Sequence, residues 1–505
     1  MMSPEANPNS ASRVSSALIV GTSILIPAIL LARIALNFRH QYFLTHVEGA
    51  WLTCASDFVH GVFYRPLFSS LGYGGTRYFP LYFVLTGFFS KIFGSLATAG
   101  LFLSCASVVA LCCAVFVFLR RFGASMLLSV AGVTSLLAVS TTQQALLSAK
   151  GDSLAAMLNF FGILLCVKSK ISRASVYLAA FFFALAFATK LTTVFGVAAV
   201  VSAWVLARRY KGAVELAFAT GAGYIVVLST MYLASGGRVF AIFRACAAGG
   251  GSFSYTLQAP IHLISKALEV DPIFLLFLVP AAAFGLVLIF RSDQEDDFRF
   301  LPIYFVLVSL VTTVIFGSPG IGVNHLLDLQ VAAVLLIVLA IARIPELKDV
   351  GASLLALSLV VACVPAAQDL HGDLHRQSIP GDSREIVKRI PAANGTEGSA
   401  DPRPILAENP AVLLTSGQSP YLLDPFMFRI LARSQPALAK DFWEKMTHRG
   451  FSAIVLLRDP GSAEGKTWYT DTHFGGEFLQ DLDKNYAYSF SVGQMYVYTP
   501  KPAQP

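Results

Sequence analysis

Long runs of apolar residues recur from residue 16 to residue 366 and are separated by short polar stretches. They cover residues 16–37, 78–93, 98–119, 124–143, 152–168, 175–189, 191–207, 213–234, 272–290, 300–316, 325–342 and 350–366. A helix of about 17–25 apolar residues can cross the hydrocarbon core of a bilayer, where backbone groups must find their partners within the helix. The pattern therefore predicts an all-α polytopic membrane protein, and we expect its first run to be retained as a transmembrane helix.

The composition agrees with this prediction and excludes most soluble folds. Hydrophobic residues make up 55% of the chain and charged residues only 13%, with a mean hydropathy of +0.65, whereas soluble and disordered chains are more polar. The net charge is +7, and the excess of basic residues lies within residues 1–366. Because these residues follow the loops and form no continuous stripe, they indicate membrane topology, and we expect no nucleic-acid partner.

Basic residues in short loops orient the chain. Pairs such as Arg120-Arg121 and Arg208-Arg209 are expected to face the cytoplasm by the positive-inside rule. That orientation places the first long loop, residues 39–77, on the exterior side, together with the turns around Lys150 and Lys190 and everything after residue 366. The predicted location is the bacterial cytoplasmic (inner) membrane, which the chain crosses several times.

The number of crossings leaves two alternatives open. An odd number must lie between Arg77 outside and Arg120-Arg121 inside, yet two apolar runs, 78–93 and 98–119, occur there. Either one of these runs is re-entrant, or Arg120-Arg121 faces outward and residues 124–143 fail to cross. Both alternatives predict about eleven transmembrane helices.

Residues 367–505 have the mixed composition of a soluble domain, in contrast to the transmembrane domain of residues 1–366. Short apolar runs alternate with polar ones, and a linker rich in Gly, Pro and Ser includes residues 380–383 and 391–404. We expect strands at residues 405–406, 411–414, 453–457 and 494–498 and helices at 384–390 and 436–448. This pattern predicts a small exterior α/β domain.

The 7 cysteines occur at no spacing typical of a metal or redox site. Only Cys54 and Cys246 fall in predicted exterior loops, and the sequence leaves a disulfide between them open. We assign the cysteines no metal or redox role, so the candidates for chemistry are the charged residues.

Charged residues beside apolar helices are costly, which makes those on the exterior side candidates for function. Glu48 lies at the mouth of the first helix in an aromatic loop, where a poorly solvated carboxylate can act as a general base. The alternative is that Glu48 caps an interfacial helix. Asp57, Tyr64 and Arg65 follow in the same loop and are candidates for substrate binding, although a solvated helix face explains Asp57 equally well.

Two lysines and an aspartate lie at the other exterior turns. Asp152 opens an apolar helix two residues after Lys150, and Lys190 lies at a separate turn. Two ammonium groups on one side of the bilayer suit a phosphate head group. The alternatives are that Asp152 caps its helix and that Lys190 snorkels to the membrane interface.

A loop rich in Gly and Pro, residues 317–323, leads into Asn324, His325 and Asp328. These three residues share one end of the following helix, where they are candidates to bind a polar ligand. The alternative is a simple helix start capped by Asn324. Arg244, in the remaining exterior loop, is a further cation for a phosphate or a lipid head group.

Taken in order, these residues resemble the GT-C superfamily of integral-membrane glycosyltransferases, in particular bacterial relatives of the aminoarabinose transferase and the protein O-mannosyltransferases. The resemblance covers most of the chain and includes its exterior C-terminal domain. It is carried by Glu48-Gly49, Gly61 and Tyr64, residues 78–82, Lys150 and Asp152, Thr189-Lys190 and residues 324–328. The chain departs from the family at Lys150, where arginine is common, and at Val47, where a second acid is common, which leaves a divalent metal open.

The resemblance implies an inverting glycosyltransferase that moves a sugar from a polyprenyl-phosphate donor to an acceptor on the exterior face, either a glycan, a lipid or a protein of the cell envelope. It implies Glu48 as the general base and Asp152 or Asp328 as the group that orients the sugar hydroxyls. Lys150, Lys190 or Arg244 would bind the phosphate.

Two other classes of protein remain as alternatives. A secondary transporter of a polar or lipid-linked solute would also gather charges in its helices, but near the bilayer midplane and in repeated halves. A non-catalytic membrane scaffold would use the exterior domain to bind a partner, and its Glu48 would only cap a helix.

Overall fold

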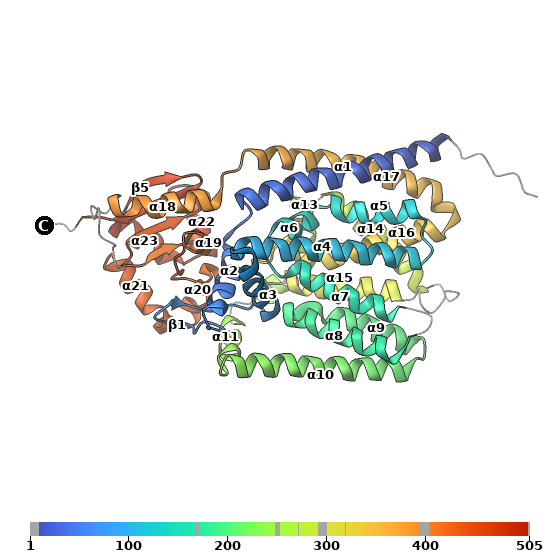
Figure 1. Cartoon of the computed structure of the whole chain (residues 1–505), viewed down its shortest axis with the longest axis horizontal. Helices are drawn as coiled ribbons and strands as arrows, with labels where there is room; N and C mark the ends of the chain where they lie inside the picture. Colours follow the sequence, from blue (N-terminus) through green and yellow to red (C-terminus); the bar gives the residue numbers. More distant parts are fainter. Residues whose placement is uncertain are drawn as a thin grey trace, which may run out of the picture.

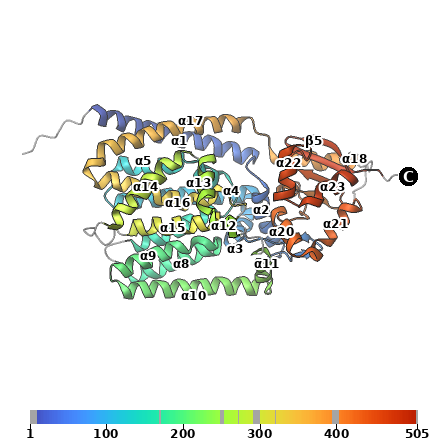
Figure 2. The ribbon, with the colours of Figure 1, turned by 180° about the vertical axis from the view of Figure 1, so that it is seen from behind.

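A computed structural model describes residues 10–502, apart from residues 168–170, 248–252, 271, 291–299, 319 and 394–402. It shows a bundle of long helices with a small mixed domain at one end (Figures 1 and 2). We call this end of the bundle the domain end and the opposite one the far end. Most of the predicted linker at residues 391–404 lies outside the described residues.

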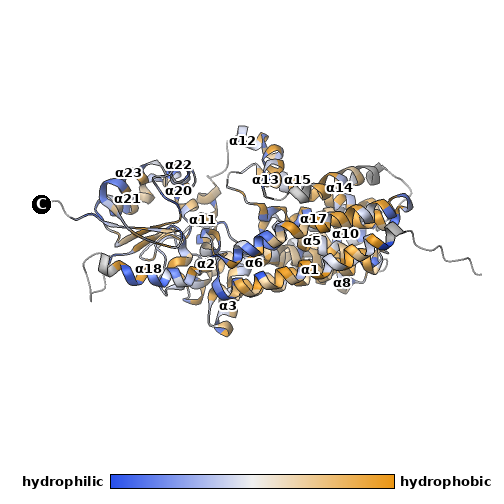
Figure 3. Ribbon diagram, turned by 90° about the horizontal axis from the view of Figure 1, so that it is seen from above, coloured by the Kyte–Doolittle hydropathy of each residue, from blue (hydrophilic) through white to orange (hydrophobic). Residues whose placement is uncertain are grey.

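The bundle confirms the prediction of a mostly helical, apolar protein (Figure 3). Five helices are long and apolar enough to cross a membrane, or six if one bent pair is counted as a span, and six shorter apolar helices lie beside them in the part of the chain that the structure describes. The figure of eleven crossings stays a prediction. The bundle helices are α1 (Ser10–His40), α3 (Pro80–Phe93), α4 (Leu96–Arg121), α5 (Met126–Ala138), α6 (Ser140–Leu147), α7 (Asp152–Cys166), α8 (Arg173–Thr189), α9 (Val194–Leu206), α10 (Tyr210–Ala234), α13 (Ala259–Val270), α14 (Pro272–Phe290), α15 (Phe300–Phe316), α16 (Leu327–Arg343) and α17 (Lys348–Leu374).

Helix α3 favours one of the two topological alternatives. It has 14 residues, and both its ends contact the first turns of α4: the Tyr82 hydroxyl donates to the Gly100 carbonyl at 2.8 Å, and the rings of Phe93 and Phe102 lie 4.9 Å apart. The helix therefore lies across the start of α4 instead of running beside it. Helices α5 and α6 are bent by 70° and together return the chain to the domain end (Figure 1). This arrangement supports a run at residues 78–93 that does not cross.

The C-terminal domain contains a four-stranded sheet in the order β3-β4-β6-β5. Strand β3 (Ile405–Ala407) is parallel to β4 (Ala453–Leu456), and β6 (Met495–Pro500) is antiparallel to both β4 and β5 (Tyr486–Val492). Helices α18 (Ile379–Ala393), α19 (Pro410–Thr415) and α23 (Gly476–Asn485) pack against the strands. The domain also contains α20 (Pro425–Ser434), α21 (Lys440–Thr447) and α22 (Ala463–Thr467). A small α/β domain is thus confirmed, although α17 continues past the predicted boundary at residue 366 to Leu374.

The predicted strand at residues 411–414 is wrong, because these residues form helix α19. The Asn409 side chain caps that helix and Pro410 occupies its first position, and both are signals for a helix start. In a short run that is buried on all sides, apolar and polar residues do not alternate with a spacing that distinguishes a helix from a strand. The sequence also gave no prediction for strand β5.

The first long loop is folded and docks on the C-terminal domain. It contains α2 (His46–Val59) and a hairpin of β1 (Phe68–Ser69) and β2 (Gly72–Tyr73). The Tyr73 amide donates to the Tyr421 carbonyl at 2.7 Å, and a Cβ atom on Gly72 would lie 2.1 Å from that same oxygen.

The remaining short elements at the domain end are α11 (Arg238–Ala247), α12 (Phe253–Leu257), η1 (Leu191–Thr193) and η2 (Val323–Leu326). Cys54 and Cys246 are both free thiols, so the disulfide left open above is not formed.

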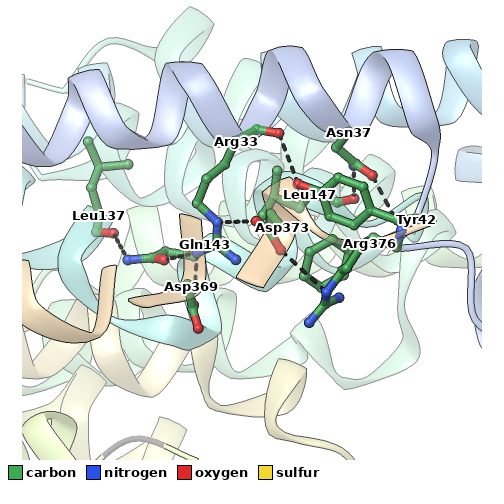
Figure 4. A network of polar contacts seen from close by, with 10 residues as sticks. Arg33, Asn37, Tyr42, Leu137, Gln143, Leu147, Asp369, Asp373 and Arg376 are labelled. Carbon is green, nitrogen blue, oxygen red and sulfur yellow. Dashed lines mark hydrogen bonds and ion pairs between the residues drawn. The ribbon is translucent and has the colours of Figure 1, made fainter. Parts of the chain in front are cut away.

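A buried polar network joins α1, α6 and α17 (Figure 4). Arg33 pairs with Asp373 at 2.6 Å and with Asp369 at 2.9 Å, and it donates to the Gln143 side chain at 2.5 Å. Asn37, one turn further along α1, donates to the Leu147 carbonyl at the end of α6 at 2.6 Å. The network therefore fixes the end of α6, which is three residues before Lys150 in the chain.

We expect Arg33→Met to lower the free energy of unfolding by about 3–5 kcal/mol, because the buried Asp373 carboxylate keeps only the half-exposed Arg376, 3.5 Å away, as a cationic partner among the described residues. Asp369→Asn is the control within the same network: the Asp369 side chain is 50% exposed, against 1% for Asp373, so its loss is expected to cost at most about 1 kcal/mol. Thermal unfolding of the two purified variants followed by circular dichroism tests this. Equal losses in both would show that burial of Asp373 does not set the stability.

Candidate active site

Glu48 lies in the first turn of α2 and is buried between that helix and the bundle. Its Oε2 atom accepts a hydrogen bond from the Thr45 amide at 3.0 Å and another from the Thr45 hydroxyl, which closes a capping box at the start of α2. Its Oε1 atom lies 3.1 Å from the Lys150 ammonium. The capping alternative is therefore correct for one oxygen, while the other forms an ion pair that the sequence did not predict.

Both side chains of the Glu48–Lys150 pair are ionised. Burial raises the pKa of the Glu48 carboxyl, but the Lys150 charge and the Thr45 hydroxyl outweigh it and hold this pKa below its ordinary value. Burial lowers the pKa of Lys150, but the charges of Glu48 and Asp152 outweigh it and raise this pKa above its ordinary value. Each group thus keeps the other ionised inside a poorly solvated site.

A second ion pair lies beside the first. Asp152, at the first position of α7, accepts from the Lys190 ammonium at 2.6 Å and from the Asn324 amide at 2.8 Å. The turn between the two pairs is compact, because a Cβ atom on Gly151 would lie 3.1 Å from the Trp51 ring. The structure therefore brings together predicted site residues from α2, α7, the end of α8 and η2.

His325 and Asp328 follow Asn324 and lie near the second pair. The charges of Lys190 and Asp152 act on both of them. The His325 Nδ1 atom is buried and accepts or donates no hydrogen bond in the described part of the protein, and no described cation forms an ion pair with Asp328. These are groups with unused capacity to bind a polar ligand.

Asp57, Tyr64 and Arg65 are held in contacts of their own. Both Asp57 oxygens accept from Arg65, at 2.8 and 3.0 Å, and Arg65 also donates to the Pro420 carbonyl of the C-terminal domain at 2.7 Å. The Tyr64 hydroxyl donates to the Tyr78 carbonyl at 2.8 Å. These contacts tie the loop to the C-terminal domain, and a role of the three residues in substrate binding stays a prediction.

Some exposed arginines at the domain end make no ion pair or hydrogen bond with any described residue, and two of these are candidates to bind a phosphate. One is the predicted Arg244 on α11, and the other is Arg77, which the sequence analysis missed. Arg77 directly precedes Tyr78, whose ring stacks on Trp51 with centroids 4.1 Å apart. Its position next to the motif at residues 78–82 could have identified Arg77 as a candidate site residue from the sequence. Both guanidinium groups are free to bind an anion.

The donor set does not match a divalent cation. Glu48 and Asp152 are each already paired with a lysine ammonium, at 3.1 and 2.6 Å. Among residues 10–502, outside the gaps named above, no group of three or more His, Cys, Asp or Glu side chains is placed to hold a metal ion.

Solved structures share this fold. ArnT from Cupriavidus metallidurans bound to undecaprenyl phosphate is 12% identical with a TM-score of 0.56, over 95% of this chain and 98% of that chain. The archaeal oligosaccharyltransferase AglB from Archaeoglobus fulgidus, in complex with an inhibitory peptide and a dolichol-phosphate, is 11% identical with a TM-score of 0.60, over 97% of this chain and 75% of that chain. No protein-family model and no curated protein matches the sequence.

Both of these proteins are GT-C glycosyltransferases. The resemblance drawn from the sequence is thus confirmed at the level of the fold, over nearly the whole chain and including its C-terminal domain.

Proposed function

We propose that this protein is an inverting glycosyltransferase of the bacterial cytoplasmic membrane, which moves a sugar from a polyprenyl-phosphate donor to an envelope acceptor on the exterior side. The observation that carries the proposal is the two adjacent ion pairs, Glu48–Lys150 and Asp152–Lys190, at one end of an apolar bundle. Such a transfer requires cations for a leaving phosphate and a carboxylate for a proton. The fold shared with a structure that holds undecaprenyl phosphate supports this class of donor.

The donor phosphate competes with the carboxylates for the two ammonium groups. When Lys150 turns to the phosphate, Glu48 loses the charge that lowers its pKa, and burial then raises that pKa. A carboxylate with a raised pKa is a better general base at neutral pH. Donor binding would therefore prepare Glu48 for the proton transfer.

In the transfer itself, the acceptor hydroxyl oxygen attacks the anomeric carbon while the bond from that carbon to the phosphate oxygen breaks. Glu48 takes the hydroxyl proton, and the polyprenyl phosphate leaves with the bonding electrons. The leaving phosphate needs no proton, but it needs cations to stabilise its charge. Lys150 and Lys190 supply these cations together with Arg77 or Arg244. Positive charge develops on the sugar ring, and Asp152, Asn324 and Asp328 would orient the sugar hydroxyls.

The same geometry argues against the other two classes of protein. A transporter is expected to hold its charges near the bilayer midplane, whereas Glu48, Lys150, Asp152 and Lys190 lie where the bundle meets the C-terminal domain. A scaffold does not require two buried ion pairs, because burying charged groups costs free energy that apolar contacts of similar volume do not cost.

Undecaprenyl phosphate is the probe that tests the proposal without knowledge of the sugar. A ligand that binds the folded state raises its melting temperature, so we expect this lipid to stabilise the wild-type protein in detergent more than undecaprenol does. Transfer is then measured with undecaprenyl phosphate carrying radiolabelled hexoses or pentoses, in membranes that supply the acceptor. Equal effects of the two lipids and no release of labelled sugar from any donor would contradict the proposal.

Replacing Lys150 tests the state of Glu48. In Lys150→Met, burial of Glu48 is no longer opposed by the neighbouring charge, so the pKa of Glu48 rises. The acid limb of the pH profile of kcat/KM, below which the base is protonated, should move upward by about 1–3 pH units. Lys91→Met, at an exposed position on α3, should leave the profile unchanged. An unshifted acid limb in Lys150→Met would mean that Glu48 is not the titrating base.

A further inference from the structure

A short turn of the C-terminal domain, Glu408-Asn409-Pro410, lies between β3 and α19 and packs against the start of α2. The Asn409 side chain is buried, and its amide nitrogen donates to the Leu44 carbonyl at 2.7 Å, just before Thr45 caps α2. Its oxygen accepts from the Ala411 amide at 3.0 Å and so caps α19. A single side chain thus joins the starts of two helices from different parts of the fold.

Gly49 makes this approach possible. A Cβ atom at this position would lie 2.7 Å from the Ala411 nitrogen and 2.7 Å from the Asn409 oxygen, closer than non-bonded atoms can approach. The residue after Glu48 is therefore pressed against the C-terminal domain backbone. This contact gives a structural reason for the glycine in the Glu48-Gly49 pair.

The turn is fixed to the rest of the C-terminal domain by the buried carboxylate of Glu408, both of whose oxygens accept hydrogen bonds. The oxygens of Glu408 accept from the His473 ring at 2.9 Å, the Trp468 indole at 2.6 Å, the Tyr469 hydroxyl at 2.8 Å and the Leu457 amide at 2.7 Å. Burial raises the pKa of Glu408, but the hydrogen bond and charge of His473 outweigh it and hold this pKa below its ordinary value. Four donors around one carboxylate make a rigid anchor.

His473 extends this anchor to α2. Its ring is buried and packs edge-on against the ring of His46, with centroids 4.6 Å apart. His46 is the first residue of α2 and lies two residues before Glu48. The C-terminal domain thus contacts α2 on both sides of Glu48, at His46 and at Gly49.

We propose that Glu408, Asn409 and His473 are positioning residues, which hold the first turn of α2 so that Glu48 faces Lys150 and the acceptor. This inference rests on the proposed function, in which Glu48 is the base, and it gives the C-terminal domain a part in the transfer step. Because the lysines that bind the donor lie in the bundle, loosening α2 affects the chemical step and leaves donor binding intact. Small displacements of a reacting group are costly, up to about 100-fold per Å.

Asn409→Ser is the sharpest test, because serine still caps α19 but cannot reach the Leu44 carbonyl. We expect kcat to fall roughly 10- to 100-fold with an unchanged KM for the undecaprenyl-phosphate sugar. Hydrogen exchange of the amides of residues 44–52 should become faster. In a Glu48→Gln background the same substitution should cause no further loss, since there is no base left to position, whereas a loss of general stability would act equally in both backgrounds.

Gly49→Ala should reproduce the loss of kcat, because its Cβ atom forces α2 away from Ala411. Gly21→Ala is the matched control: it adds the same methyl group to helix α1, where nothing lies within 4 Å, and should leave kcat unchanged. Unchanged exchange at residues 44–52 in Asn409→Ser would overturn the positioning role. If exchange becomes faster while Glu48→Gln transfers normally, the base assignment fails and the contact between the domains stands.

Discussion

Glu48→Gln is expected to lower sugar transfer by roughly 10²- to 10⁴-fold, the range that a general base contributes. Glutamine keeps the shape of the side chain and can still close the capping box with Thr45, so α2 should form as before. It cannot take up the proton of the acceptor hydroxyl. The measurement is the initial rate of transfer by purified protein, with binding of undecaprenyl phosphate measured on the same preparation.

Glu385→Gln serves as the matched control for this substitution. Among the described residues Glu385 pairs with Arg389, one turn away on α18, and its side chain is 55% exposed, so its replacement should change neither transfer nor stability. Full transfer by Glu48→Gln would favour the scaffold class or another base. Loss of both lipid binding and transfer would show that the substitution damages the site as a whole.

The elements that the sequence predicts well are those with a strong local signal. The apolar runs identify the bundle helices because a span in lipid needs an unbroken apolar surface. Glu48, Lys150, Asp152 and Lys190 are recognisable because charges beside apolar helices are rare. The structure places all four within two adjacent ion pairs.

What the sequence could not predict depends on contacts between distant residues. Nothing local pairs Glu48 with Lys150 instead of Lys190, since the pairing follows from the packing of α2 against the turn before α7. The Arg33 network depends on Asp369 and Asp373, more than 300 residues away in the chain. The contact of Asn409 with Leu44 likewise belongs to the docking of two domains, and neither residue type suggests it.

Lys190→Ala is the second change with a large expected effect. In the proposed reaction it removes a cation for the leaving phosphate, and loss of one such group costs about 10²- to 10³-fold in kcat. It also leaves Asp152 with only the Asn324 amide as a partner. We therefore expect lower transfer, weaker binding of undecaprenyl phosphate and a lower melting temperature.

A second substitution separates these effects. In Asp152→Asn/Lys190→Ala both members of the pair are uncharged, so neither is left as an uncompensated ion, and most of the lost stability should return because the penalty lies in that ion. Transfer should not return, since the phosphate still lacks its cation and the sugar lacks the Asp152 carboxylate. If the double variant regains transfer together with stability, the Asp152–Lys190 pair only supports the fold, and the phosphate must be bound by Lys150 and the free arginines instead.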